Sequence, residues 1–139
     1  TLISPEMHDE FLLQYQLPIL EKFGLSAYGC CEDLTSKIDM LRKIPNLRRI
    51  AVSPFANVAK CAEQIGSDYV ISYRPSPADM VSYGFDTDRI TKIISGDIDV
   101  MRRNGACFDI TLKDVETVQK DPARIRRWVE LVRSITEKL

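Results

Sequence analysis

The stretch RIAVSPFANVAKCAEQIGSDYVISYR, residues 49–74, decides the fold. It contains a short apolar run at 49–53, helical spacing of apolar residues over 57–65 that Gly66 closes, and a second apolar run at 69–73. Two short strands joined by a helical crossover pair in parallel, because parallel strands cannot be joined by a tight hairpin. The stretch therefore predicts one complete βαβ unit.

The same alternation continues on both sides of this unit. Further strands are expected at 26–31 and 106–111, and a long helix is expected at 86–104. Asp121-Pro122 reads as an N-cap followed by proline, which predicts a last helix from there towards the end of the chain. With a helix also expected ahead of the first strand, the chain reads as four consecutive βα units.

Composition bounds what such a chain can be. The sequence has 139 residues, of which 45% are hydrophobic and 28% charged, the balance of an ordinary globular protein. No Pro/Gly/Ser-rich linker interrupts it, so residues 1–139 are expected to form a single domain. The formal net charge of -1 argues against a nucleic-acid partner. No apolar run is long enough for a membrane span or a signal peptide, and the four cysteines match no disulfide framework, so a cytoplasmic setting is expected.

Four βα units can form either an open doubly wound sheet or half of a closed barrel. A doubly wound nucleotide-binding sheet would show a glycine-rich phosphate turn, and neither GxGxxG nor GxxxxGK[ST] occurs in the sequence. We therefore expect an α/β fold that is the C-terminal half of a (β/α)8 TIM barrel, with about four parallel strands and covering helices. The helix ahead of the first strand suggests that a strand lies upstream, so the chain is expected to be a fragment of a longer one.

Polar residues gather where the expected strands end. Glu32, Ser53, Arg74, Asp109 and Lys113 all fall at or just after the carboxyl end of a strand. In a (β/α) barrel this is where catalytic groups sit. Glu32 is a candidate general base, and Asp109 a second catalytic carboxylate that needs a partner, for which Lys113 is available. Arg74 is suited to hold a substrate carboxylate or phosphate.

Alternation along the first strand places Tyr28, Cys30 and Glu32 on one face, which we expect to be the inner, polar face. The other cysteines have simpler interpretations. Cys31 and Cys61 are expected to be packing residues. His8, a lone histidine in the first turns of a helix, is expected at the surface.

Two segments carry a resemblance to a known family. The segment ISPEMHDEF at 3–11, and AYGCCE at 27–32 on the strand that follows, are similar to the uroporphyrinogen decarboxylase superfamily. This superfamily includes true decarboxylases and methylcobamide-dependent methyltransferases. Its members are complete (β/α) barrels, so the resemblance implies that this chain covers about the last four βα units of one.

The resemblance also implies a metal site. In the methyltransferase branch a His-x-Cys motif on the matching strand and a cysteine on the last strand bind zinc, which activates a thiol acceptor. Carried over, Cys30 and Cys107 are the zinc ligands, and Tyr28 stands where the family has histidine. The decarboxylase branch has a histidine near the last strand, whereas the only histidine of this chain is His8. The methyltransferase branch is therefore favoured.

These observations combine into one hypothesis. The chain is expected to be the C-terminal part of a corrinoid-linked methyltransferase, with uroporphyrinogen decarboxylase proper and a self-associating, non-catalytic half-barrel as alternatives. Its partners are a small-molecule substrate, a corrinoid protein and, in the last alternative, a second copy of the chain; the fragment alone should be inactive. The expected site consists of catalytic Glu32 and Asp109, substrate-binding Tyr28, Ser53, Arg74 and Lys113, and metal ligands Cys30 and Cys107.

Overall fold

One parallel sheet holds the four strands found in the described part of the chain. The computed structural model describes residues 3–82 and 84–138. The strands follow one another across the sheet in chain order: β1 (Ser26–Tyr28), β2 (Leu47–Val52), β3 (Val70–Tyr73) and β4 (Cys107–Ile110). The predicted α/β class with four parallel strands is confirmed.

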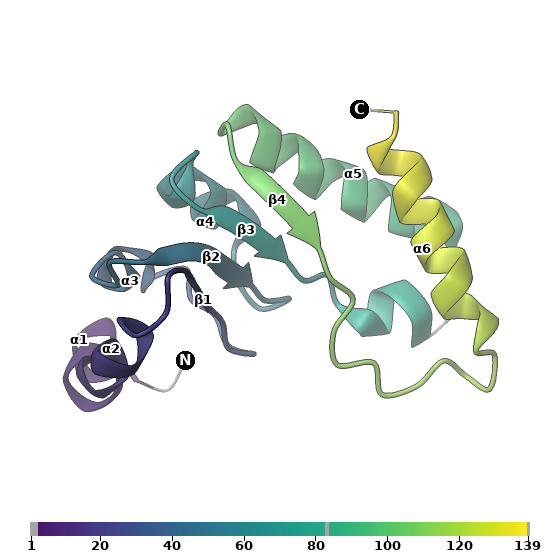
Figure 1. Cartoon of the computed structure of the whole chain (residues 1–139). Coiled ribbons are helices and arrows are strands. Elements are labelled where there is room, and N and C mark those ends of the chain that lie inside the picture. The colour runs from purple at the N-terminus through teal and green to yellow at the C-terminus, as the bar shows by residue number, and fades with distance from the viewer. Residues whose placement is uncertain (1–2, 83, 139) are drawn as a thin grey trace.

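Helices precede the sheet and separate its strands (Figure 1). An almost continuous helical run leads into β1: α1 (Pro5–His8), the wider π-helical turn η1 (Asp9–Leu13) and α2 (Gln14–Leu20). The remaining helices are α3 (Ile38–Leu41), α4 (Val58–Ile65), η2 (Ala78–Ser82), α5 (Thr87–Arg103) and α6 (Ala123–Thr136).

Local sequence signals account for several helix boundaries. Ser4 accepts a hydrogen bond from the Met7 amide at 3.2 Å, as an N-cap does, and Asn57 caps α4 in the same way. Gly66, with a φ of 50°, adopts the left-handed backbone that ends α4. Strand ends were predicted less well, because β1 stops at Tyr28 rather than continuing to residue 31.

One face of the sheet is covered and the other is open. Helices α3, α4 and α5 lie along the covered face, and no helix in the described part of the chain lies over the opposite face (Figure 1). Ile50 and Ile71 pair across β2 and β3 and are fully buried on the covered face. The Tyr73 hydroxyl, also on that face, donates to the Asp97 carboxylate of α5. This face therefore supplies the apolar core.

The open face carries smaller and more polar side chains. Ala51, Ser72 and Asp109 lie side by side across β2, β3 and β4. Arg49, two residues before Ala51, lies on the same face of β2. This confirms the predicted split between an apolar and a polar face for these three strands.

The prediction for the first strand was wrong. Tyr28 pairs with Ile50, which places it on the helix-covered face rather than the inner, polar one. Cys30, two residues further on, packs partly against the core. The pairing between β1 and β2 shifts register between Ser26 and Ala27. Alternation alone could not reveal that shift, because the first strand is short and apolar on both faces.

Candidate functional site

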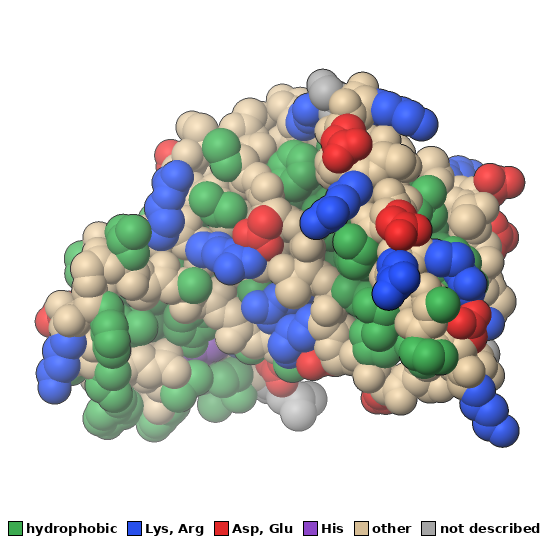
Figure 2. Space-filling view, turned by 45° about the vertical axis from the view of Figure 1, so that its right-hand side comes forward, with side chains coloured by type: hydrophobic (Ala, Val, Ile, Leu, Met, Phe, Trp, Pro, Cys, Tyr) green, Lys and Arg blue, Asp and Glu red, His purple; other side chains and the backbone are tan. Residues whose placement is uncertain are grey.

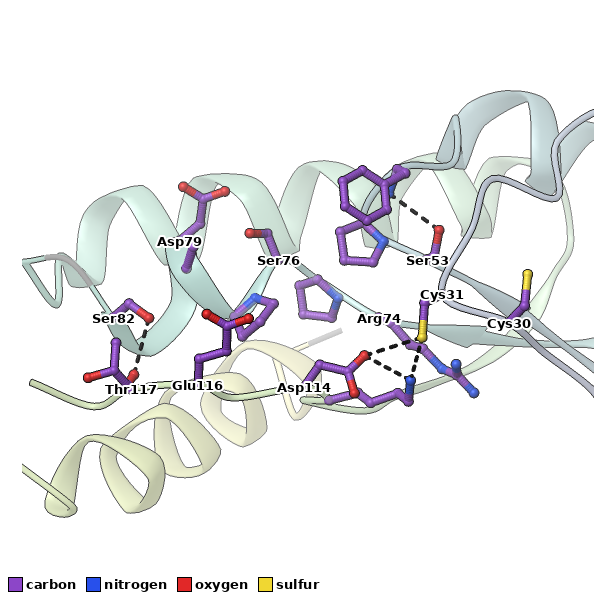
Figure 3. Close-up of a pocket in the computed structure, with 16 residues that line it drawn as sticks. Cys30, Cys31, Ser53, Arg74, Ser76, Asp79, Ser82, Asp114, Glu116 and Thr117 are labelled. Atoms are coloured by element: carbon purple, nitrogen blue, oxygen red, sulfur yellow. Dashed lines mark hydrogen bonds and ion pairs between the residues drawn. The ribbon is translucent and has the colours of Figure 1, made fainter. Parts of the chain in front are cut away.

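The loops that follow all four strands enclose a cavity of about 530 Å³ at the carboxyl edge of the sheet (Figure 3). Each loop contributes polar side chains: Cys31 after β1, Ser53 after β2, Arg74 after β3 and Lys113 after β4. The structure thus brings together three of the predicted strand-end residues, Ser53, Arg74 and Lys113. We call this cavity the carboxyl-end pocket.

Arg74 lines the pocket, and its guanidinium is unpaired. Its backbone amide donates to the Val52 carbonyl at 3.0 Å, which extends the pairing of β3 with β2. Its guanidinium makes no hydrogen bond to any described residue, and its Nε is buried without a partner. The guanidinium lies against Gly29, where an added Cβ would come within 3.1 Å of Nη2. A buried donor without a partner is costly, so this group is suited to an anionic ligand.

Cys31, Lys113 and Asp114 form a cluster on the wall of this pocket. The Lys113 ammonium donates to Cys31 Sγ at 3.0 Å and to Asp114 Oδ2 at 2.8 Å. Cys31 Sγ lies 3.7 Å from the same carboxylate. The hydrogen bond from Lys113 lowers the pKa of Asp114, and the contacts with Asp114 and Cys31 raise the pKa of Lys113. The sequence-based interpretation of Cys31 as a packing residue was wrong, because its side chain is exposed in the pocket.

The backbone at Asp114 supports this arrangement. Asp114 has a φ of 57°, in the left-handed region that residues other than glycine rarely adopt. Aspartate tolerates this conformation better than most residues, and such positions are concentrated at functional sites. No sequence pattern could have indicated it.

Asp109 does not belong to the carboxyl-end pocket. Its Oδ1 accepts from Arg49 Nη2 at 2.5 Å on the open face of the sheet, with 39% of the aspartate and 42% of the arginine side chain exposed. Ser72 and Thr111 also donate to this oxygen, at 3.3 and 3.2 Å. The prediction that Asp109 needs a partner is confirmed, but Lys113 is not that partner, because Lys113 lies beyond the strand end and pairs with Asp114.

Ser53 and Glu32 connect two loops. The Ser53 hydroxyl donates to the Glu32 carbonyl at 2.8 Å and accepts from the Phe55 amide at 3.3 Å. Ser53 is buried, so its first role in this structure is to hold the loops after β1 and β2 together. Glu32 lines a different cavity from Ser53.

That second cavity, of about 690 Å³, lies between the N-terminal helical run and β1. A chain of hydrogen bonds runs along its wall: Lys37 Nζ to His8 Nδ1 at 3.0 Å, His8 Nε2 to Tyr28 Oη at 2.7 Å, and Tyr28 Oη to Gln16 Oε1 at 3.0 Å. An ammonium has no lone pair, so Nδ1 of His8 accepts, Nε2 carries the proton, and His8 is neutral. We call these four residues the His8 chain.

His8 and Lys37 are 5% and 1% exposed, so the predicted surface position of His8 was wrong. Burial, and then the nearby Lys37 ammonium, lower the pKa of His8. The sequence contains a signal for the burial of Lys37. This residue follows Leu34 and precedes Leu41 at helical spacing, so it lies in the middle of an apolar stripe. A lysine in such a position needs a partner, and the buried histidine supplies it.

The predicted zinc ligands do not fit a shared metal ion. Cys107 is the first residue of β4. It pairs with Val70, which in turn pairs with Arg49, so Cys107 lies on the open face at the amino end of the sheet. Cys30 lies past the carboxyl end of β1 and against the core. Three strand spacings of about 4.8 Å separate β1 from β4, whereas zinc requires its sulfur ligands at about 2.3 Å. Within residues 3–82 and 84–138 no three His, Cys, Asp or Glu side chains are grouped as a metal site would need.

Comparison with known proteins adds no relative. No protein-family model, no curated protein and no solved structure matches the chain. Among the described residues, no helix is both long and apolar enough to cross a membrane.

Proposed function

We propose that this chain is the C-terminal half of a (β/α)8-barrel enzyme related to the uroporphyrinogen decarboxylase superfamily, in its methyl-transfer branch. The carboxyl-end pocket is half of the active site, and its substrate carries an anionic group. The resemblance at residues 3–11 and 27–32 supports the family, and the fold of the described residues supports the architecture.

The uncovered, polar face of a parallel sheet is the observation that carries the proposal. Parallel sheets occur almost only with both faces covered, yet Arg49 and Asp109 lie half-exposed on a face without helices. In a closed barrel this face points inwards, where side chains from alternate strands fill the interior. Four strands cannot close a barrel, so four more βα units must complete it.

The residues of this chain are suited to bind the substrate. Arg74, unpaired at the carboxyl edge, holds the carboxylate, sulfonate or phosphate of the substrate. Lys113 adds a second positive charge on the same wall. A methylated corrinoid on a partner protein would supply the methyl group. Because Cys30 and Cys107 do not converge, no step of the reaction is assigned to a zinc ion held by this chain.

The experiment is a methyl-transfer assay of the protein in its natural length. Methylcobalamin is incubated with an anionic thiol, mercaptoacetate, or with neutral 2-mercaptoethanol, and loss of the methyl–cobalt absorption is followed. We expect thiol-dependent demethylation that is faster with mercaptoacetate. No demethylation, together with release of carbon dioxide from a porphyrinogen polycarboxylate, would instead establish the decarboxylase alternative.

A second candidate function, self-association of the half-barrel, rests on two exposed apolar surfaces. Phe11 and Tyr15 of the N-terminal helical run are 65% and 68% exposed, and this run lies beside β1 (Figure 1). Hydrophobic side chains gather at the left-hand side of the surface in Figure 2. Ile125 and Val129 of α6 are exposed at the β4 side of the molecule. Two copies of the chain could pair β1 with β4 twice and close an eight-stranded barrel, with these helix faces in contact. Sedimentation distinguishes the candidates: a particle of two copies favours the self-associating half-barrel.

A further inference from the structure

The carboxyl-end pocket contains a cysteine, Cys31, that has no part in the proposed binding of an anionic substrate. Cys31 Sγ is exposed to the pocket and accepts a hydrogen bond from the Lys113 ammonium at 3.0 Å. The other three cysteines lack this contact: Cys61 is buried, Cys30 is bonded to the Glu32 backbone, and Cys107 lies on the open face of the sheet. We propose that Cys31 is a covalent nucleophile for electrophiles that carry a carboxylate or phosphate, which Arg74 holds.

Two features favour attack by the Cys31 sulfur. The Lys113 ammonium lies 3.0 Å from the Cys31 sulfur, and reactive cysteines, whose nucleophilic form is the thiolate, typically lie beside such a cation. Asp114 holds that cation in place, since its carboxylate bonds to the same Lys113 nitrogen at 2.8 Å. Asp114, which makes this contact, has a left-handed backbone, a conformation concentrated at functional sites.

A third feature selects the electrophile. Arg74 and Cys31 line the same pocket, and Arg74 is close enough to Asp114 to lower the pKa of its carboxyl (Figure 3). Its guanidinium has no hydrogen-bonding partner among the described residues. An anionic group on Arg74 therefore brings the rest of a small molecule to the side of the pocket where the thiol lies. Such positioning raises the rate of attack without any further catalytic group.

The covalent step is a substitution at carbon. The Cys31 thiol loses its proton to solvent, the sulfur lone pair forms a carbon–sulfur bond, and the leaving group departs with the electron pair of its bond to carbon. With iodoacetate the products are S-carboxymethyl-Cys31 and iodide. The inference rests on the proposed function only in treating this pocket as the substrate site, since alkylation needs neither a corrinoid nor a thiol acceptor.

Iodoacetate and iodoacetamide test the proposal as a matched pair, because they perform the same reaction and differ in charge. Alkylation of the natural-length protein is followed over time by peptide mass spectrometry at each cysteine. The iodoacetate-to-iodoacetamide rate ratio at Cys31 should exceed that at Cys107, the other exposed thiol, by about fivefold or more at low salt. Added salt should reduce the excess.

Variants separate the roles of the two cations. R74Q should remove most of the preference for iodoacetate, R74K should retain part of it, and K113Q should slow both reagents at Cys31. R48Q, which removes an exposed arginine of β2 outside the pocket, should leave all rates unchanged. Equal rate ratios at Cys31 and Cys107 in the unmodified protein would overturn the proposal, and they would do so whether or not methyl transfer is observed.

Discussion

Replacing Gly29 with alanine should lower the free energy of unfolding by about 1–3 kcal/mol, the usual cost of overpacking a tight contact. A Cβ at residue 29 would lie 2.8 Å from the Cβ of Ala51 and 3.1 Å from Nη2 of Arg74. The arginine can move, but the Ala51 Cβ is fixed to the backbone of β2, so β1 must shift away from β2. Urea unfolding followed by circular dichroism measures the change.

Gly96→Ala is the matched control for this substitution. Gly96 lies inside α5, and an added Cβ there would have no atom within 4 Å. Because alanine is a better helix former than glycine, G96A should stabilise the protein by about 0.5–1 kcal/mol. If G29A proves as stable as the unmodified protein while G96A behaves as expected, Gly29 does not pack closely against β2 and Arg74.

Acid should destabilise the protein through His8. The pKa of His8 in the folded protein lies below its ordinary value of 6.5, so between the two values the unfolded chain binds more protons than the folded one. His8 therefore contributes no loss of stability above about pH 6.5, and an increasing loss as the pH falls from there through the folded pKa. The structural reason is that a proton on Nδ1 would face the Lys37 ammonium at 3.0 Å.

The measurement is the free energy of unfolding between pH 7.5 and 5 for the unmodified protein and for H8Q, whose amide can donate and accept but does not titrate. Asp9 and Glu32 also face His8 and act in the opposite direction on its pKa. Burial raises the pKa of Asp97, which would make the protein more stable on acidification, but this contribution is common to both proteins. The H8Q curve should fall less steeply below pH 6.5, and parallel curves would show that His8 does not titrate against Lys37.

The sequence predicted the sheet well, because its evidence is local. The apolar runs of β2 and β3, the N-cap at Asn57 and the glycine at 66 each act within a few residues, and all agree. The predicted face was right for Ser72 and Asp109 and wrong for Tyr28, since one register shift near the start of β1 reverses the orientation of every later side chain.

The site was predicted only in part, because its contacts join residues far apart in the chain. Arg74 and Lys113 were placed correctly at strand ends. The partner of Asp109 was not found, since Arg49 lies 60 positions away and reaches it diagonally across β3. The contact between Cys31 and Lys113 spans 82 positions and depends on the loop conformation at Asp114, which no local pattern indicates.

Amide hydrogen exchange in the natural-length protein is the most direct test of whether this sheet is half of a closed barrel. In a closed barrel the outward backbone groups of β1 and β4 pair with neighbouring strands. We predict that the amides of residues 26–28 and 107–110 exchange as slowly as those of β2 and β3, the two inner strands of the described sheet. Exchange of the outward amides of β1 and β4 at the rate of exposed loops would show that the sheet has free edges, and would contradict the half-barrel.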